Sequence, residues 1–146
     1  MFVVGSSGGS STDQHSTELL DTSTLMWTEK KQYPYETKIY AVRSLFHQDQ
    51  FIAFGGHLGQ ISTNRIAAYN PQADEWSLLG QTIIARSWTS VVETDNTFLI
   101  VGGLYMDGSD SSSNSKLSEK CRFNDRGDLI CETQTPLMPA GGKYKS

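Results

Sequence analysis

Three histidines are the residues of this sequence best suited to acid–base or metal chemistry. His15, His47 and His57 each fall in a polar segment between apolar runs. No two of them have the four-residue spacing of a helical zinc motif, and none has an obvious carboxylate partner nearby. We therefore expect surface histidines that neither bind a metal nor act as bases, and the sequence predicts no enzyme.

The two cysteines of the sequence, Cys121 and Cys131, flank a turn-forming stretch at 124–128. Two antiparallel strands around this turn would bring the cysteines opposite each other, at a distance that permits a disulfide. A disulfide would indicate an oxidising compartment, whereas two half-buried thiols would fit a reduced cytosol. The sequence leaves both states open, and with them both a cytoplasmic and an extracellular location.

Two further features resemble ligand sites only superficially. Asp107 and Asp110, with serines at 111–113, supply oxygen donors but lack the regular ligand spacing and the glycine of an EF-hand loop. Double glycines at 55–56 and 102–103 lack the third glycine and the following helix of a dinucleotide-binding motif. We predict that the Asp/Ser segment is a solvated loop and that the double glycines mark places where neighbouring backbones approach closely. We expect no cofactor at either feature.

The double glycines belong to a longer pattern that recurs along the chain. The apolar run 51–54 leads into Gly55-Gly56, and the run 98–101 leads into Gly102-Gly103, 47 positions later. A third apolar run, at 2–4, leads into Gly5-Ser6. Each copy then contains two large apolar residues with six residues between them, namely Leu20 and Trp27, Tyr69 and Trp76, and Phe123 and Ile130. A period near 50 residues predicts a repeat architecture.

This pattern resembles the kelch repeat, in which an apolar run ends in Gly-Gly and is followed by tyrosine, six residues and tryptophan. Residues 51–76 carry the whole pattern, whereas the first copy has Ser6 and Leu20 at motif positions and the third has Phe123 and Ile130. The resemblance implies an all-β fold made of β-propeller blades, each of four antiparallel strands. The fixed spacing of the aromatic residues, and Trp88 with them, predicts that they pack within and between blades.

Blade boundaries follow from the repeat, and the kelch-type region covers 1–146. We expect a partial blade without its first strand at 1–29, blades at 37–79 and 86–133, and the start of a following blade or a tail at 134–146. The first strands of the two complete blades are predicted at 37–46 and 86–92. Propellers typically have about 4 to 8 blades, so roughly three blades do not close a ring. We expect a piece of a larger propeller, with self-assembly of several copies as the alternative.

Composition narrows the choice of partners. The formal net charge is −4 and the 12 Lys and Arg residues are scattered, so the basic stripe typical of nucleic-acid binding is absent. No apolar run approaches the ~20 residues of a membrane span. The first residues do not have the basic region and apolar run of a signal peptide, so we expect none.

Loop positions predict where a protein partner binds. Loops between second and third strands share one face with the connections between blades, and they vary in length, as recognition loops of repeat proteins do. This face is predicted from the segments 6–16, 30–36, 57–64, 80–85, 104–116 and 134–141. The candidate contact residues are His57, Leu58, Gln60, Leu104, Tyr105, Met106 and Asp107.

The sequence therefore predicts a kelch-type scaffold that binds another protein and has no chemistry of its own. Two alternatives stay open. One is part of a propeller enzyme, such as an oxidase or a glycan-acting hydrolase, whose catalytic groups come from loops around the ring. The other is an extracellular adhesion or matrix module, which bonding of the two cysteines would favour.

Overall fold

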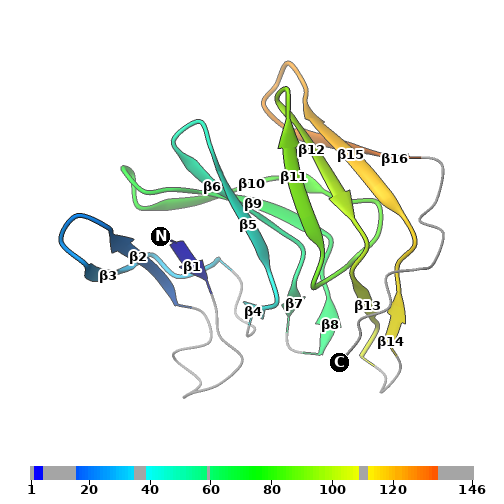
Figure 1. Cartoon of the computed structure of the whole chain (residues 1–146), viewed down its shortest axis with the longest axis horizontal. Coiled ribbons are helices and arrows are strands. Elements are labelled where there is room, and N and C mark those ends of the chain that lie inside the picture. The colour runs from blue at the N-terminus through cyan, green and yellow to red at the C-terminus, as the bar shows by residue number, and fades with distance from the viewer. Residues whose placement is uncertain (1, 5–15, 35–38, 59, 109–111, 135–146) are drawn as a thin grey trace.

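A computed structural model describes residues 2–4, 16–34, 39–58, 60–108 and 112–134, and it folds them into β-strands and turns (Figure 1). The prediction of an all-β fold is confirmed. Gly5, His15 and Asp110 lie outside the described residues, as do most of the predicted loop 6–16 and the segment from 135 onward. Over the part of the chain that is described, no helix is present that would be long and apolar enough to cross a membrane.

Two main sheets make up the fold. The first sheet consists of β1 (Phe2–Val4), β2 (Thr17–Asp21) and β3 (Met26–Lys30), paired antiparallel in that order. The second has eight strands in the order β11-β12-β15-β16-β10-β9-β6-β5. Its strands are β5 (Arg43–His47), β6 (Gln50–Phe54), β9 (Arg65–Asn70), β10 (Glu75–Gln81), β11 (Ser90–Thr94), β12 (Thr97–Val101), β15 (Ser118–Phe123) and β16 (Leu129–Gln134).

The eight-stranded sheet consists of two antiparallel units of four strands. We call β5-β6-β9-β10 the middle unit and β11-β12-β15-β16 the last unit. A single parallel pair, Gly80 with Leu129, joins their outer strands. At the other edge β5 and β11 lie beside each other, so the sheet almost closes on itself (Figure 1). The two units therefore face each other across a shared interior.

The main core fills this interior. Strand alternation directs Ile52 and Phe54 of the middle unit toward Phe98 and Ile100 of the last unit, and all four side chains are buried. Phe54 and Phe98 have ring centroids 5.5 Å apart. Each such side chain contributes about 1.5–3 kcal/mol when it leaves water. The opposite face of the middle unit packs Ala67 against a smaller cluster.

Short β-hairpins occupy the predicted second-to-third-strand loops. The strands β7 (His57–Leu58) and β8 (Ile61–Ser62) pair with β4 (Ile39–Tyr40) in a small sheet. The strands β13 (Leu104–Met106) and β14 (Ser112–Asn114) form a second hairpin. Paired strands thus lie within the segments 57–64 and 104–116, where the sequence predicted loops.

The middle and last units repeat the same backbone geometry with a period of 47 residues. Equivalent positions share a left-handed conformation, and their φ angles are 44° and 48° at Gln48 and Asp95, 64° and 58° at Asp49 and Asn96, 58° and 67° at Gly55 and Gly102, and 107° and 99° at Gly56 and Gly103. In both units the first glycine donates to a carbonyl at the start of the third strand, at Arg65, or just before it, at Leu117. The sequence period therefore corresponds to a structural one.

The first strand of each unit is shorter than predicted. The predicted strand 37–46 is interrupted at Ala41, with φ 55°, and the predicted strand 86–92 is interrupted at Trp88, with φ 52°. A left-handed residue redirects the chain, so β5 begins only at Arg43 and β11 only at Ser90. The two interruptions lie against each other, because the Trp88 N–H donates to the Ala41 carbonyl at 3.2 Å.

The aromatic pairs follow the predicted spacing in two copies out of three. Leu20 lies opposite Trp27 and Tyr69 lies opposite Trp76. In the last unit Phe123 lies opposite Leu129, because its turn is one residue shorter. Leu129 is 1% exposed whereas Ile130 is 59% exposed, so the motif position predicted at Ile130 is wrong by one residue.

Two predicted core tryptophans are exposed. Tyr69 is buried, and it packs on the half-buried Trp76, with ring centroids 5.2 Å apart. Trp27 and Trp88 are 48% and 53% exposed, so the prediction that they pack in a core is wrong for the molecule as it stands. Trp27 lies in the first sheet, and Trp88 lies at the left-handed interruption before β11.

Candidate binding face

We use the name binding face for the surface formed by the β7-β8 hairpin, the β13-β14 hairpin and the connection 82–89, which is the candidate for contact with a partner. The two hairpins lie at the same end of the molecule, along the lower edge of Figure 1. Isolated bridges join Ile61 to Asp107 and Ser87 to Leu104, so the hairpins and the connection form one surface. The hairpin turns of β5-β6, β11-β12 and β15-β16 lie at the opposite end.

A groove of about 500 Å³ crosses this face. Its lining residues come from the connection between the two units and from the β13-β14 hairpin and its continuation, and they are Ile83, Ile84, Ala85, Tyr105, Ser115, Lys116 and Leu117. Ile83 is 50% exposed and Tyr105 is 42% exposed. Lys116 is the one charged residue of this lining. The groove therefore offers an apolar surface with a cation at its edge.

A buried ion pair holds both walls of the groove. Arg86 and Glu119 are fully buried and form a salt bridge with each other. Glu119 also accepts hydrogen bonds from the backbone N–H of Ile83 at 2.6 Å and of Ile84 at 3.3 Å. Arg86 donates to the carbonyl of Leu117 at 3.0 Å. One charge pair thus fixes the backbone on two sides of the groove.

The same ion pair connects the groove to the core of the last unit. Arg86 donates to the carbonyl of Gly102 at 3.0 Å, at the strand end marked by the double glycine. Burial lowers the pKa of Arg86 from its ordinary value, and the nearby charge of Glu119 opposes this effect. A guanidinium stays protonated in proteins, so the site contains a charged pair and not a neutral one.

A second buried network ties the hairpins together. The Ser87 hydroxyl lies 2.7 Å from Nε2 of His57, and the Ser62 hydroxyl lies 3.5 Å from its Nδ1. Ser62 accepts a hydrogen bond from the backbone N–H of Met106 at 3.0 Å. Burial lowers the pKa of His57, which favours the neutral ring. The network therefore links β7, β8, β13 and the connection through uncharged groups.

This serine–histidine contact has the distance of a nucleophile and its base. However, Ser87 is fully buried and His57 is 2% exposed. The second ring nitrogen of His57 faces the hydroxyl of Ser62, whereas the orienting group of a catalytic triad is a carboxylate or an amide. We therefore assign this contact a structural role, which is to fix the hairpins and the connection relative to one another.

The structure brings the seven predicted contact residues to this face, with different exposures. Gln60, Tyr105 and Asp107 are exposed, whereas Leu58, Leu104 and Met106 are half-buried and His57 is buried. Sequence reasoning assigned the connection 80–85 to this face but did not single out Ile83. The sequence signal for Ile83 was its position next to Ile84 in a connecting segment, since loops exposed to solvent consist mainly of polar residues, glycine and proline.

Surface histidines were expected, but His47 is buried as well as His57. Its ring stacks on Phe123 at 5.5 Å and meets Phe98 edge-on at 5.1 Å. Its Nδ1 lies 2.7 Å from a carboxylate oxygen of Glu93. The contact joins the ends of β5 and β11, so His47 belongs to the closure between the two units.

Cys121 and Cys131 are joined by a disulfide. They lie directly opposite each other in β15 and β16, on either side of the predicted turn. With Glu119 they form the one group of three potential metal ligands that the described residues contain. Because the two sulfurs are bonded to each other and Glu119 pairs with Arg86, this group does not offer a free ligand set.

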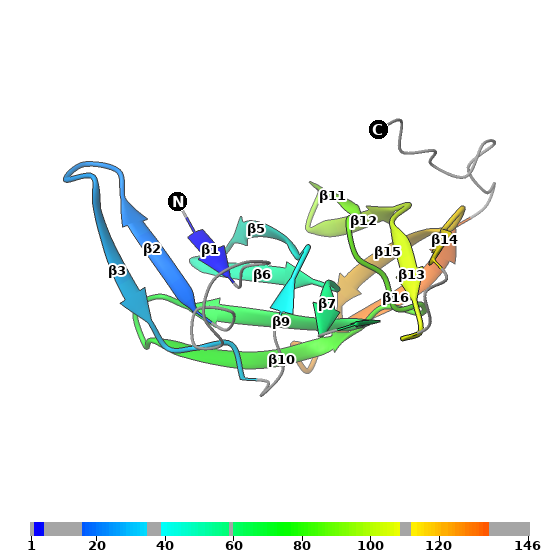
Figure 2. The same cartoon turned by 90° about the horizontal axis from the view of Figure 1, so that it is seen from below.

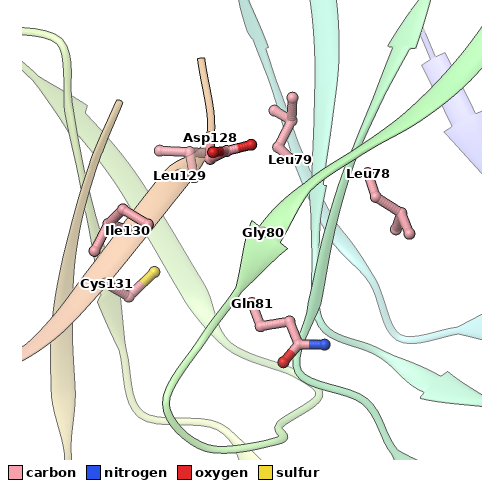
Figure 3. A pocket seen from close by; sticks show the side chains of 8 residues that line it. All are labelled: Leu78, Leu79, Gly80, Gln81, Asp128, Leu129, Ile130 and Cys131. Carbon is pink, nitrogen blue, oxygen red and sulfur yellow. The ribbon is translucent and has the colours of Figure 1, made fainter. Parts of the chain in front are cut away.

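A second groove, of about 530 Å³, lies between the outer strands β10 and β16 (Figure 3). It is lined by residues 78–81 and 128–131. A Cβ at Gly80 would clash with the carbonyl oxygen of Leu129, so glycine is needed where the strands meet. The side chains in Figure 3 spread around Gly80 and do not converge on a common point. We therefore assign no ligand to this groove.

Comparison with known proteins supports the fold and gives no function. No family model and no curated protein matches the sequence. Among many solved chains of similar structure, YjhT has a TM-score of 0.63 at 14% sequence identity. The alignment covers 83% of this chain and 44% of the YjhT chain. At this identity the likeness concerns the fold alone, and this chain spans less than half the length of YjhT.

Proposed function

We propose that the chain is a set of kelch-type β-propeller blades that acts as a non-enzymatic scaffold for another protein. The middle and last units are two blades, and the first sheet is a partial third. The period of 47 residues supports this reading, because the same left-handed positions and glycine hydrogen bonds recur in both units. The four-strand antiparallel order of each unit is that of a propeller blade.

The groove on the binding face is the proposed site of contact with the partner protein. It exposes Tyr105 and Ile83 beside Lys116, over a backbone that the Arg86–Glu119 pair holds in place. Aromatic residues are enriched in protein interfaces and often serve as anchors. A partner that fits presents an apolar side chain to the groove and a carboxylate to Lys116.

Quantitative capture of partners by the purified chain tests the proposal. The amounts of cross-linked partner are compared for the wild type, Tyr105→Ala, Lys116→Glu and the control Leu78→Ala. Leu78 lies on the outer strand β10, away from the groove, and its side chain is 60% exposed. Loss of an anchor of about 1.4 kcal/mol or more lowers affinity at least about tenfold. We expect that loss for Tyr105→Ala and Lys116→Glu and none for Leu78→Ala. The same proteins captured equally by all four chains would refute the groove as the binding site.

The disulfide supports a second candidate, an extracellular adhesion or matrix module of the same fold. Disulfides persist in oxidising compartments and are rare in the cytosol, and Cys121 is bonded to Cys131. Intact mass after alkylation, with and without reductant, reports the state in protein taken from its native source. Two cysteines alkylated without reductant would remove the support for this candidate.

A further inference from the structure

Two exposed sheet faces lie at opposite ends of the part of the chain that the structure describes. The first sheet and the last unit lie at opposite ends in both views (Figures 1 and 2). In the middle unit, Tyr69 and Trp76 face the preceding segment, where Trp76 packs edge-on against Tyr33 at 4.9 Å. Leu20 and Trp27 are the equivalent pair of the first sheet. Their face is therefore the one directed away from the middle unit, and Trp27 is 48% exposed on it.

The far face of the last unit is also apolar and exposed. Phe98, Ile100 and Leu129 point into the main core, so strand alternation directs their neighbours outward. Three aliphatic side chains lie on the outward face, and Val92, Leu99 and Ile130 are 53%, 36% and 59% exposed. Val92 lies directly opposite Leu99 in the strand register. Large exposed apolar surface of this kind is typical of an interface.

The two faces carry opposite charge. On the first sheet, Glu18 and Glu29 share the face of Leu20 and Trp27 and lie directly opposite each other. A like-charged cross-strand pair is unfavourable unless a cation neutralises it. On the last unit, Lys120 and Arg122 share the outward face, along with Glu132 and the aliphatic residues. Two carboxylates thus stand on one face, and two cations with one carboxylate on the other.

Arg122 and Glu132 form an exposed salt bridge at 2.9 Å, and the two side chains are 58% and 57% exposed. Lys120 has no salt bridge within 4.0 Å among the described residues. The outward face of the last unit therefore keeps an excess of positive charge. This excess is opposite in sign to the negative charge of the Glu18–Glu29 pair on the first sheet.

We propose that a second copy of this chain covers both faces. The last unit of one copy packs on the first sheet of the other, and a two-fold axis repeats the contact, so that neither face stays open. This inference rests on the proposed blade architecture. A contact between unlike surfaces closes into a ring when the rotation permits. The chain spans 44% of YjhT, so two copies supply twice that share, or 88%, of the length of one such chain.

Molar mass in solution gives the first test. Light scattering after size exclusion should find twice the monomer mass of 16.2 kDa. Lys120→Glu with Arg122→Glu places five carboxylates together at each contact, Glu132 included, and Glu18→Lys with Glu29→Lys places four cations there. Like charges across an interface cost several kcal/mol, so each double variant should raise the dimer Kd at least about 100-fold.

Mixing the two double variants gives the decisive test. Each contact of the mixed dimer again pairs opposite charges, so the 1:1 mixture should regain the dimer that neither variant forms alone. Circular dichroism of each variant before mixing checks that it is folded, and a single chain carrying all four substitutions should dimerise by itself. A monomeric or polydisperse wild type, dimeric double variants, or a mixture that stays monomeric would each overturn the proposal.

The groove provides an independent readout. None of the four substituted residues lines it, because its lining comes from residues 83–85, 105 and 115–117. A monomeric wild type that still loses its partner on Tyr105→Ala would overturn the dimer and leave the proposed function standing. A dimeric wild type whose binding of partners is unchanged by Tyr105→Ala would refute the groove as the binding site and leave the dimer standing.

Discussion

Substitution of Glu119 by Gln tests how the binding face is held. Glutamine has nearly the same size, so it creates no cavity, but it removes the negative charge beside Arg86. It also retains one acceptor oxygen in place of two. Glu119 accepts from both Ile83 and Ile84, so at least one of these backbone N–H groups loses its best acceptor.

The expected cost follows from burial. Arg86 and Glu119 are both fully buried, with 1% and 0% of their side chains exposed. Removal of one partner from a buried ion pair leaves an uncompensated charge and costs about 3–5 kcal/mol. Loss of one acceptor for a backbone N–H adds about 1 kcal/mol. Because domains of ordinary stability unfold with about 5–15 kcal/mol, Glu119→Gln removes a large part of the total.

Urea unfolding measures this difference directly. The matched control is Glu75→Gln, since Glu75 lies 4.0 Å from Lys31 in a pair whose side chains are 67% and 59% exposed. An exposed pair contributes about 0–1 kcal/mol, so the control should unfold like the wild type. A loss for Glu119→Gln below about 1 kcal/mol, or equal losses for both variants, would refute the argument. A folded Glu119→Gln chain should also bind its partner more weakly, because Ile83 is no longer fixed.

Three further predictions concern other parts of the fold. Gly103→Ala should lower the free energy of unfolding in urea by about 2–4 kcal/mol, because φ is 99° and the new Cβ would lie 2.7 Å from the Ser87 carbonyl oxygen. The control Gly127→Ala has a φ of 84° but open space around the new Cβ, so it should lower this free energy by only about 1–2 kcal/mol. Equal losses for the two variants would contradict the argument from close approach. The pKa of His57 is below 6.5 in the folded state, so at falling pH this histidine binds a proton in the unfolded chain before it does so in the folded one. The free energy of unfolding therefore decreases as the pH drops below 6.5. His57→Gln should make this free energy depend less on pH between pH 7 and pH 5. Trp76→Ala should lower the unfolding free energy by about 3–5 kcal/mol, and an effect below 1 kcal/mol would mean that its ring contacts do not stabilise the sheet.

Local features of the sequence predicted the strands well. The double glycines end β6 and β12, as predicted, and in both places the backbone is left-handed. The polar turns 47–50 and 94–97 lie 47 residues apart and have matching φ angles. Such features depend on a few neighbouring residues, so a single sequence contains them. The common end at which the hairpins and the connection between the units lie could also be predicted, because alternating strand direction determines where each loop emerges.

Contacts between distant segments account for what the sequence did not reveal. Arg86 and Glu119 are 33 residues apart, and nothing near either residue marks it as buried. His47 and His57 were expected at the surface because they fall in segments predicted as turns or loops. In the fold, aromatic rings surround His47 and serine hydroxyls from other segments contact His57. The one-residue error at Ile130 has a local origin, since the turn after Phe123 is one residue shorter than the turn after Tyr69.

The proposed function assigns stability and recognition to different layers of the same face. Tyr105 and Lys116 are exposed at the groove, and substitutions at exposed positions usually change stability by less than about 0.5 kcal/mol. Arg86 and Glu119 lie directly beneath, where a change of either residue affects the core and the groove together. We therefore expect variants of the exposed layer to change partner preference while the fold stays intact. Unfolding measurements on Tyr105→Ala and Lys116→Glu that match the wild type, together with altered partner capture, would show this separation, whereas parallel losses in both would show that the two layers are coupled.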